Sequence, residues 1–115
     1  NGDWSIPRIL AHMAVMAEHN GTFIYQMGTM TDPSRLAFDG DAESERLQHQ
    51  NPVMLVEMIE RDLGNTIDFL SGTPDASWGR PGRKGGLRRS LRQEVTTHGD
   101  HMHEHIDEIE RLLNG

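Results

Sequence analysis

The sequence predicts an all-α protein, because three long stretches have helical periodicity and none of useful length alternates as a β-strand does. Two connections rich in turn-forming residues separate these stretches. We therefore expect three helices of roughly 20–27 residues in an antiparallel, up-down bundle. Three amphipathic helices can close a core, although four do so more comfortably. The length of 115 residues suits one domain, which we place over residues 1–115.

The first expected helix runs from about Trp4 to Met30. Asp3 or Ser5 can cap it, and Pro7 is tolerated in its first turn because the missing N–H has no partner there. Gly21 interrupts the pattern and costs about 1 kcal/mol relative to Ala. Apolar residues recur at the three- and four-residue steps of a buried face, namely Ile6, Ile9, Leu10, Met13, Met16, Phe23, Ile24 and Met27.

The remaining chain divides into two loops and two helices. Residues 31–46 are acidic and rich in turn formers, so we expect a loop there. The second helix spans about Pro52 to Leu70, with Asn51 as its N-cap. Residues 71–86, SGTPDASWGRPGRKGG, are expected to form a long Gly/Pro loop. The third helix runs from about Leu87 to Leu113 and is stopped by the final Asn-Gly.

Composition excludes several classes of function. The formal net charge of −7 argues against nucleic acid as the main partner. One basic stretch, RPGRKGGLRR at residues 80–89, is interpreted as a solvated loop leading into a helix, with an anion site as the alternative. No apolar run approaches the ~18 residues of a membrane span, and no signal peptide is visible, so we expect a cytoplasmic protein. Without cysteine, any metal must be held by oxygen ligands or histidine.

The most distinctive stretch is HGDHMHEH, residues 98–105, which contains four histidines. At about 100° per residue, His101 and His105 lie on one flank of the apolar stripe of the third helix. His98 lies closer to that stripe and is interpreted as a flank residue. His103 falls on the opposite flank and is expected to face solvent.

Histidine spacing leaves more than one metal site open. His101 and His105 are four residues apart, so their rings can converge on one ion, whereas His98 and His101 form a competing pair. His12, near the buried face of the first helix, is either a hydrogen-bonded core residue or a ligand. If the first and third helices pack together, His12 could join the pair and leave a fourth position open, as in catalytic zinc sites. His19 lies two turns further on, and no role is assigned to His49.

Residues 101–105 also match the inverted zincin pattern H-x-x-E-H, with Glu104 as candidate base. We reject this as a peptidase signature. The third ligand of such enzymes follows far downstream, and only ten residues follow His105.

The whole chain resembles the DinB/YfiT-like superfamily of putative metalloenzymes, in its short DinB-type branch. Residues 4–13, WSIPRILAHM, are similar to the family helix W-S-x-R-E-I-L-A-H-L, whose histidine is a metal ligand. Residues 69–82, FLSGTPDASWGRPG, are similar to the inter-helix loop in which a Trp follows a P-D turn. Residues 101–113, HMHEHIDEIERLL, resemble the closing helix H-D-x-H-H-L-x-Q-I-x-x-L-L, whose first and last histidines complete the ligand set.

The resemblance implies a four-helix bundle with a metal held by His12, His101 and His105. Only three residues precede Trp4, so the first helix of the family has no counterpart in this chain. Either the chain is N-terminally incomplete, or a second copy covers the exposed groove. Because relatives often dimerise, we expect a homodimer.

The function implied by the resemblance is metal-dependent transferase or isomerase chemistry with an external low-molecular-weight thiol and a small-molecule substrate. Zinc and nickel both suit imidazole ligands. Asp100 and Glu104 are candidates to orient the ligand imidazoles, or else are solvated helix acids. Trp4 and Trp78 either line the pocket mouth or anchor the core. The alternatives are a non-catalytic metal-binding or dimerisation module and a metal-dependent hydrolase.

Overall fold

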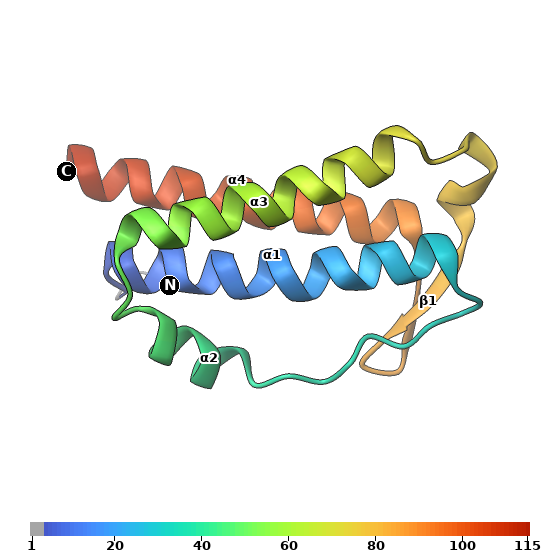
Figure 1. Ribbon diagram of the computed structural model, residues 1–115, viewed down its shortest axis with the longest axis horizontal. Coiled ribbons are helices and arrows are strands. Elements are labelled where there is room, and N and C mark those ends of the chain that lie inside the picture. The colour runs from blue at the N-terminus through green and yellow to red at the C-terminus, as the bar shows by residue number, and fades with distance from the viewer. Residues whose placement is uncertain (1–3) are drawn as a thin grey trace.

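The computed structural model describes residues 4–115 and contains three long helices, α1 (Ile6–Thr29), α3 (Pro52–Ser71) and α4 (Leu91–Asn114). α2, α3 and α4 all pack against α1, whereas α3 and α4 hardly contact each other (Figure 1). No helix of residues 4–115 is long and apolar enough to cross a membrane. The elements in chain order are α1 (Ile6–Thr29), α2 (Gly40–Leu47), α3 (Pro52–Ser71), the 3-10 helix η1 (Asp75–Gly79), β1 (Pro81–Lys84), β2 (Leu87–Ser90) and α4 (Leu91–Asn114).

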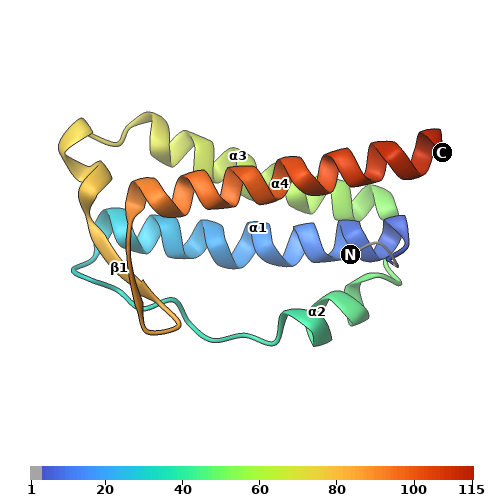
Figure 2. The same ribbon diagram turned by 180° about the vertical axis from the view of Figure 1, so that it is seen from behind.

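The expected all-α bundle is confirmed, with one difference in the direction of its helices. α4 runs antiparallel to α1, but α3 runs parallel to it (Figures 1 and 2). Gly21 lies against Thr66 and Gly28 against Phe69, so residue numbers rise together along the two helices. The chain achieves this because residues 30–51 cross back along the bundle before α3 begins.

The bounds of the first two long helices agree with the sequence patterns to within two residues. Ser5 caps α1, and its hydroxyl accepts a hydrogen bond from the Arg8 N–H at 3.3 Å. Asn51 caps α3 in the same way through the Val53 N–H at 2.9 Å. Asp3, the other candidate cap of α1, lies outside the described residues.

The loop expected over residues 31–46 is wrong in its second half, where α2 forms. Asp39 caps this helix by accepting a hydrogen bond from the Ala42 N–H at 3.0 Å. Asp41 and Glu43 lie in its first turn and Arg46 in its last, so the charges complement the helix dipole. The acids that suggested a loop are therefore helix-starting residues.

The expectations of a structureless loop over 71–86 and of no strand are also wrong. β1 and β2 form an antiparallel hairpin in which Lys84 pairs with Leu87. Gly85 and Gly86 connect them at φ values of 58° and 83°, a conformation that favours glycine in a two-residue hairpin turn. α4 therefore starts four residues later than expected, at a capping box formed by Ser90 and Gln93.

The basic stretch at residues 80–89 is not a solvated loop, because the chain itself uses most of its cations. Arg89 Nε lies 2.7 Å and Lys84 Nζ 3.4 Å from the buried carboxylate of Glu94. Arg83 pairs with an acid of the α1–α2 connection at 3.2 Å. Arg80 donates to two carbonyl oxygens at the C-terminus of α1. The hairpin is thus attached to both α1 and α4, and its cations have partners other than a bound anion.

Two apolar clusters form the core, one toward each end of α1. The first contains Ile9, Ala11, Met13, Ala14, Ala17, Leu55, Ile59 and Met102. The second contains Phe23, Ile24, Met27 and Leu91. By contrast, α3 and α4 leave several large apolar side chains exposed, among them Val53, Val56, Ile67, Ile106 and Leu113.

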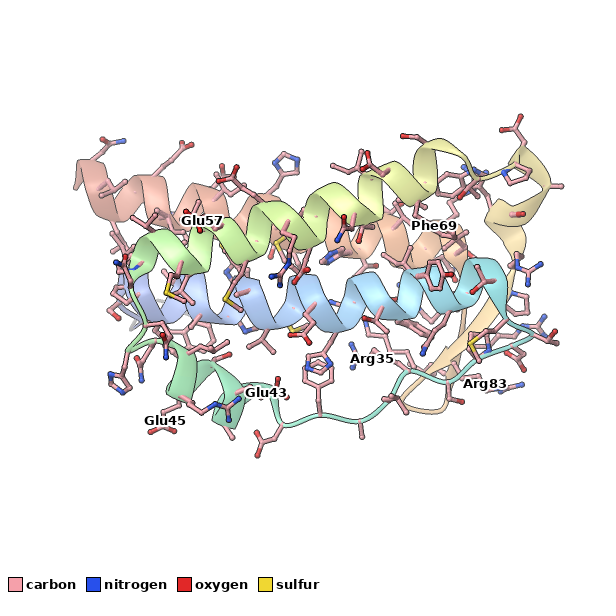
Figure 3. The ribbon with its side chains drawn as sticks, in the orientation of Figure 1. Arg35, Glu43, Glu45, Glu57, Phe69 and Arg83 are labelled. Carbon is pink, nitrogen blue, oxygen red and sulfur yellow. The ribbon has the colours of Figure 1, made fainter. Side chains whose placement is uncertain are left out.

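Glycine at position 28 allows α1 and α3 to approach closely, and Figure 3 shows Phe69 beside this part of α1. A Cβ at Gly28 would lie 2.4 Å from the Phe69 ring, whereas one at Gly64 of α3 would meet nothing within 4 Å. We expect Gly28→Ala to lower the free energy of unfolding by about 1–3 kcal/mol, because overpacking outweighs the gain in helix propensity. Gly64→Ala should instead raise it by up to about 1 kcal/mol. Urea denaturation measures both, and equal effects of the two variants would contradict the packing argument.

Candidate metal centre

His12 and His105 meet between α1 and α4. Their ring centroids are 4.8 Å apart, and the ring planes are inclined at 73°. The antiparallel course of the two helices brings these residues together although most of the chain separates them. His12 is half-buried on α1, and His105 is half-buried on the second half of α4. The structure therefore brings together two of the three histidines selected from the sequence.

The acid that orients His105 is Glu108. His105 Nδ1 lies 3.2 Å from Glu108 Oε1, which leaves Nε2 as the nitrogen available to a ligand. A carboxylate in this position fixes the ring and its tautomer, as partners of metal-bound histidines do. The sequence-based candidates for this role, Asp100 and Glu104, are both exposed on α4. Glu108 was missed, although its three-residue spacing from His105 is a signal for such a contact.

His101 lies one helical turn before His105, and its side chain is exposed. Among residues 4–115, no group of three or more His, Asp or Glu side chains is already gathered around one point. His101 is nevertheless close enough to disfavour protonation of His12. An exposed histidine is free to change rotamer, and four-residue spacing on a helix lets two rings share an ion. The structure thus brings His12 and His105 together, two donors of a kind that suits an ion preferring imidazole, and does not gather His101 with them.

Burial, followed by the nearby charges of His105 and Arg8, lowers the pKa of His12 to about 4. Asp41 opposes this shift, and His101 adds to it. The imidazole is consequently neutral at pH 7, and neutral imidazole is the form that binds a metal. His12 is thus held in its ligand-competent state before any ion arrives.

His98 is not the flank residue expected from the sequence. It is only 6% exposed, and neither ring nitrogen has a hydrogen-bond partner. Burial lowers its pKa, which the carboxylate of Glu94 partly counteracts. The buried residues of α4 are Leu91, Glu94, His98 and Met102, at about 20°, −40°, 0° and 40° around the helix, so His98 lies at the centre of the buried face. This placement makes it a core residue.

The other histidines do not join the site. His103 is exposed, as expected, and His49 is exposed in the turn after α2. His19 lies 3.0 Å from Glu43 and stacks on Phe38 at 3.8 Å, so it fastens the α1–α2 connection to α1. Figure 3 shows Glu43 on the side of α1 that this connection covers.

The two tryptophans have different roles. The Trp4 ring lies 5.1 Å from the ring of His12, so Trp4 borders the candidate site as well as packing on the core. Trp78 packs against the other cluster, with Arg92 5.9 Å from the centre of its ring. Only Trp4 can therefore line a pocket at the histidines.

The two buried histidines predict acid sensitivity in the metal-free protein. Because the folded-state pKa values of His12 and His98 lie below 6.5, the unfolded chain binds more protons once the pH falls beneath that value. The stability that His12 contributes is complete above pH 6.5 and is lost as the pH falls to about 4, and that of His98 is lost in the same direction. Urea midpoints should therefore fall between pH 7 and pH 5. His98→Leu should weaken this dependence and His103→Gln should not, while a flat profile would contradict the assignment.

Comparison with known proteins gives one structural likeness. No family model matches the sequence, and no curated protein matches it. A solved structure of YfiT from Bacillus subtilis, described as a probable metal-dependent hydrolase with an unusual four-helix bundle topology, superposes with a TM-score of 0.78. The alignment covers 98% of this chain and 69% of that chain at 18% sequence identity. The chain therefore has the four-helix-bundle fold of YfiT, which agrees with the bundle expected from its sequence.

Proposed function

We propose that this protein is a metal-dependent enzyme whose ion is bound by His12, His101 and His105. The observation that carries the proposal is the contact between the rings of His12 and His105, which come from two different helices and whose centroids are 4.8 Å apart. The hydrogen bond to Glu108 supports it, because it directs the other nitrogen of His105 toward the site. Zinc and nickel are the ions that best suit such a set of imidazoles.

A bound divalent ion would supply Lewis acidity, which lowers the pKa of a coordinated water or thiol. The residues of the chain would contribute to the site in other ways. Burial keeps His12 neutral, and Glu108 fixes the ring of His105. The Trp4 ring lies 5.1 Å from the His12 ring and borders the site on the side of the α1 N-terminus.

The proposed reaction is transfer or isomerisation that uses an external low-molecular-weight thiol and a small electrophilic substrate. The chain has no cysteine, so a thiol nucleophile must arrive with a cosubstrate. The three sequence blocks shared with the DinB/YfiT-like superfamily support this chemistry.

A second candidate is metal-dependent hydrolysis of an ester or amide. The observation that favours it is the shared fold with YfiT, which is described as a probable metal-dependent hydrolase. Both candidates use the same three histidines and differ in the nucleophile.

One experiment separates these functions. The chain is purified without an affinity tag, its metal content is measured, and the loaded protein is assayed with a chromogenic aryl halide plus thiol and with p-nitrophenyl acetate alone. Consumption of the halide only when thiol is present supports the transferase. Turnover of the ester without thiol supports hydrolysis. Tight metal binding without either reaction would identify a non-catalytic module and contradict the proposal of an enzyme.

We also propose that a second copy of the chain covers the exposed apolar side chains of α3 and α4, giving a homodimer. Ile106 is 41% and Ile67 63% exposed. Arg92 and Glu110 are both exposed and lie about five helical turns apart on one side of α4. In an antiparallel pairing of two α4 helices, Arg92 of each copy would oppose Glu110 of the other, so the surface complements itself in charge.

Sedimentation equilibrium tests the dimer. We expect the wild-type chain to be dimeric at micromolar concentration and Ile106→Glu to be monomeric, because the change places a charge among the apolar side chains. Leu36→Glu, at an exposed apolar position of the α1–α2 connection, should leave the dimer intact. A monomeric wild-type chain at 100-fold higher concentration would refute the pairing.

A further inference from the structure

Arg8 is a nearly buried cation beside the candidate metal centre. It lies one turn before His12 on α1, and its side chain is only 14% exposed. Its Nε atom is buried and has no hydrogen-bond partner among residues 4–115. The charge of Arg8 also acts on His12, where it disfavours protonation. A buried donor without a partner costs about 1–3 kcal/mol, so this arrangement favours a partner that residues 4–115 do not provide.

The counter-charge available to Arg8 within residues 4–115 is weak. Arg8 Nη2 lies 3.8 Å from a carboxylate oxygen of Asp41, whose side chain is 91% exposed. It also donates to the backbone carbonyl of Asp41 at 3.3 Å. Arg89 differs, because it contacts the almost fully buried carboxylate of Glu94 at 2.7 Å. Because Asp41 is exposed to solvent, its attraction to Arg8 is screened and offsets little of the guanidinium charge.

An open pocket leads to this guanidinium. It has a volume of about 420 Å³ and is lined by Trp4, Ser5, Arg8 and Gln48. The guanidinium carbon of Arg8 lies 5.1 Å from the centre of the Trp4 ring, and that ring lies 5.1 Å from the ring of His12. Trp4 therefore links the pocket to the metal centre, with Arg8 and His12 both against the same indole.

We propose that Arg8 binds a carboxylate of the small molecule that occupies the His12, His101 and His105 centre. This inference rests on the proposed function, because the proposed metal centre defines where the reacting atom of the ligand would lie. Four residues of helix separate Arg8 from His12, which corresponds to a rise of about 6 Å. The ligand would therefore carry its carboxylate a few bonds from the atom that reaches the metal, with the intervening carbons against Trp4.

The chemistry of the guanidinium favours this class of ligand. Its planar fork of N–H donors matches a carboxylate, and a charged pair of this kind is stronger than a neutral hydrogen bond. A neutral ligand in the same pocket could accept a hydrogen bond but could not offset the charge of the guanidinium. Selectivity for carboxylates would thus come from Arg8, whereas the histidines would bind the reacting end.

Three small probes test the inference. The first is 3-mercaptopropionate, which has both a thiol and a carboxylate, the second is 2-mercaptoethanol, which has only the thiol, and the third is propionate. Binding of the two thiols to cobalt-loaded protein is followed by the thiolate-to-metal absorption band. Propionate is titrated into metal-free protein by calorimetry, so that this measurement does not depend on the metal.

The wild-type chain is expected to bind 3-mercaptopropionate at least about tenfold more tightly than 2-mercaptoethanol, the ratio that one charge-assisted contact supplies. Arg8→Gln should reduce this ratio to near one and weaken propionate binding, with cobalt affinity unchanged. Arg8→Lys should give an intermediate ratio, because it keeps the charge but loses the fork. Arg88→Gln, at an exposed arginine of β2, is the matched control and should behave as wild type.

The outcomes separate this inference from the proposed function. If the protein binds no metal, the three-histidine proposal fails. The proposal for Arg8 can still be tested, because propionate should bind the metal-free wild-type protein more tightly than the Arg8→Gln variant. The proposal for Arg8 would be overturned if Arg8→Gln left the ratio of the affinities for 3-mercaptopropionate and 2-mercaptoethanol unchanged. Equal propionate affinities of the wild type and Arg8→Gln would also overturn it. Circular dichroism of each variant establishes that a loss of binding is not a loss of fold.

Discussion

His12→Ala is expected to lower the metal affinity of the protein at least about tenfold, since it removes one of the three proposed imidazole ligands. His12 is the proposed ligand that its lowered pKa keeps neutral at pH 7, and its ring lies against His105. Its loss would leave His101 and His105, a helical pair without a third imidazole. Competition with a chromogenic chelator measures the affinity, and the free energy of unfolding of the metal-free variant is measured alongside.

The control for this prediction is His103→Ala. His103 lies on the same stretch of α4 but is exposed and takes no part in the proposed site. Its substitution should leave metal affinity unchanged, whereas His101→Ala and His105→Ala should each lower it. Equal losses from His12→Ala and His103→Ala would refute the assignment. A chain without bound metal, with a melting temperature unaffected by His101→Ala and His105→Ala, would remove the metal proposals altogether.

Helix periodicity predicted much of the candidate site, because a helix places side chains at fixed angles. It put His103 on the solvent side and left His101 and His105 together on one flank. It was wrong for His98, which lies beside the apolar stripe by angle but at the centre of the face that α4 buries, because the buried face also includes Glu94. The packing partner His12 was beyond the reach of periodicity, since only the antiparallel contact of α1 and α4 brings it to His105.

In the fold, too, the elements that depend on local sequence could be predicted, and those that depend on contacts between distant residues could not. Helices α1 and α3 follow from caps and apolar spacing within the segments themselves. The hairpin was missed although Gly85 and Gly86 are a turn signal, because its strands are basic and only four residues long. Its strands are stabilised by distant partners, among them an acid of α4 and carbonyl oxygens of α1. The parallel course of α3 likewise depends on a crossing connection that has no apolar period.

Glu94 is the residue whose loss should destabilise the fold most among the polar groups of α4. It is only 1% exposed, and it accepts hydrogen bonds from Arg89 at 2.7 Å and Lys84 at 3.4 Å. Arg89 also donates to Thr97 at 2.8 Å, so the carboxylate anchors a network between β2 and α4. Glu94→Ala removes the shared acceptor and leaves two partly buried cations without their counter-charge. We expect a loss of about 2–4 kcal/mol in the free energy of unfolding.

Three comparisons make this prediction specific. Glu104→Ala, at an exposed acid of the same helix, should change stability by less than about 0.5 kcal/mol. Glu94→Gln should cost less than Glu94→Ala, because it keeps the volume and one acceptor oxygen. Hydrogen exchange should show the β1–β2 hairpin losing protection first, while metal affinity stays near the wild-type value because Glu94 is about three helical turns from His105. A stability loss equal to that of Glu104→Ala would show that the cations find sufficient solvation without the carboxylate, and that the apolar contacts of α4 alone hold the hairpin end of the bundle together.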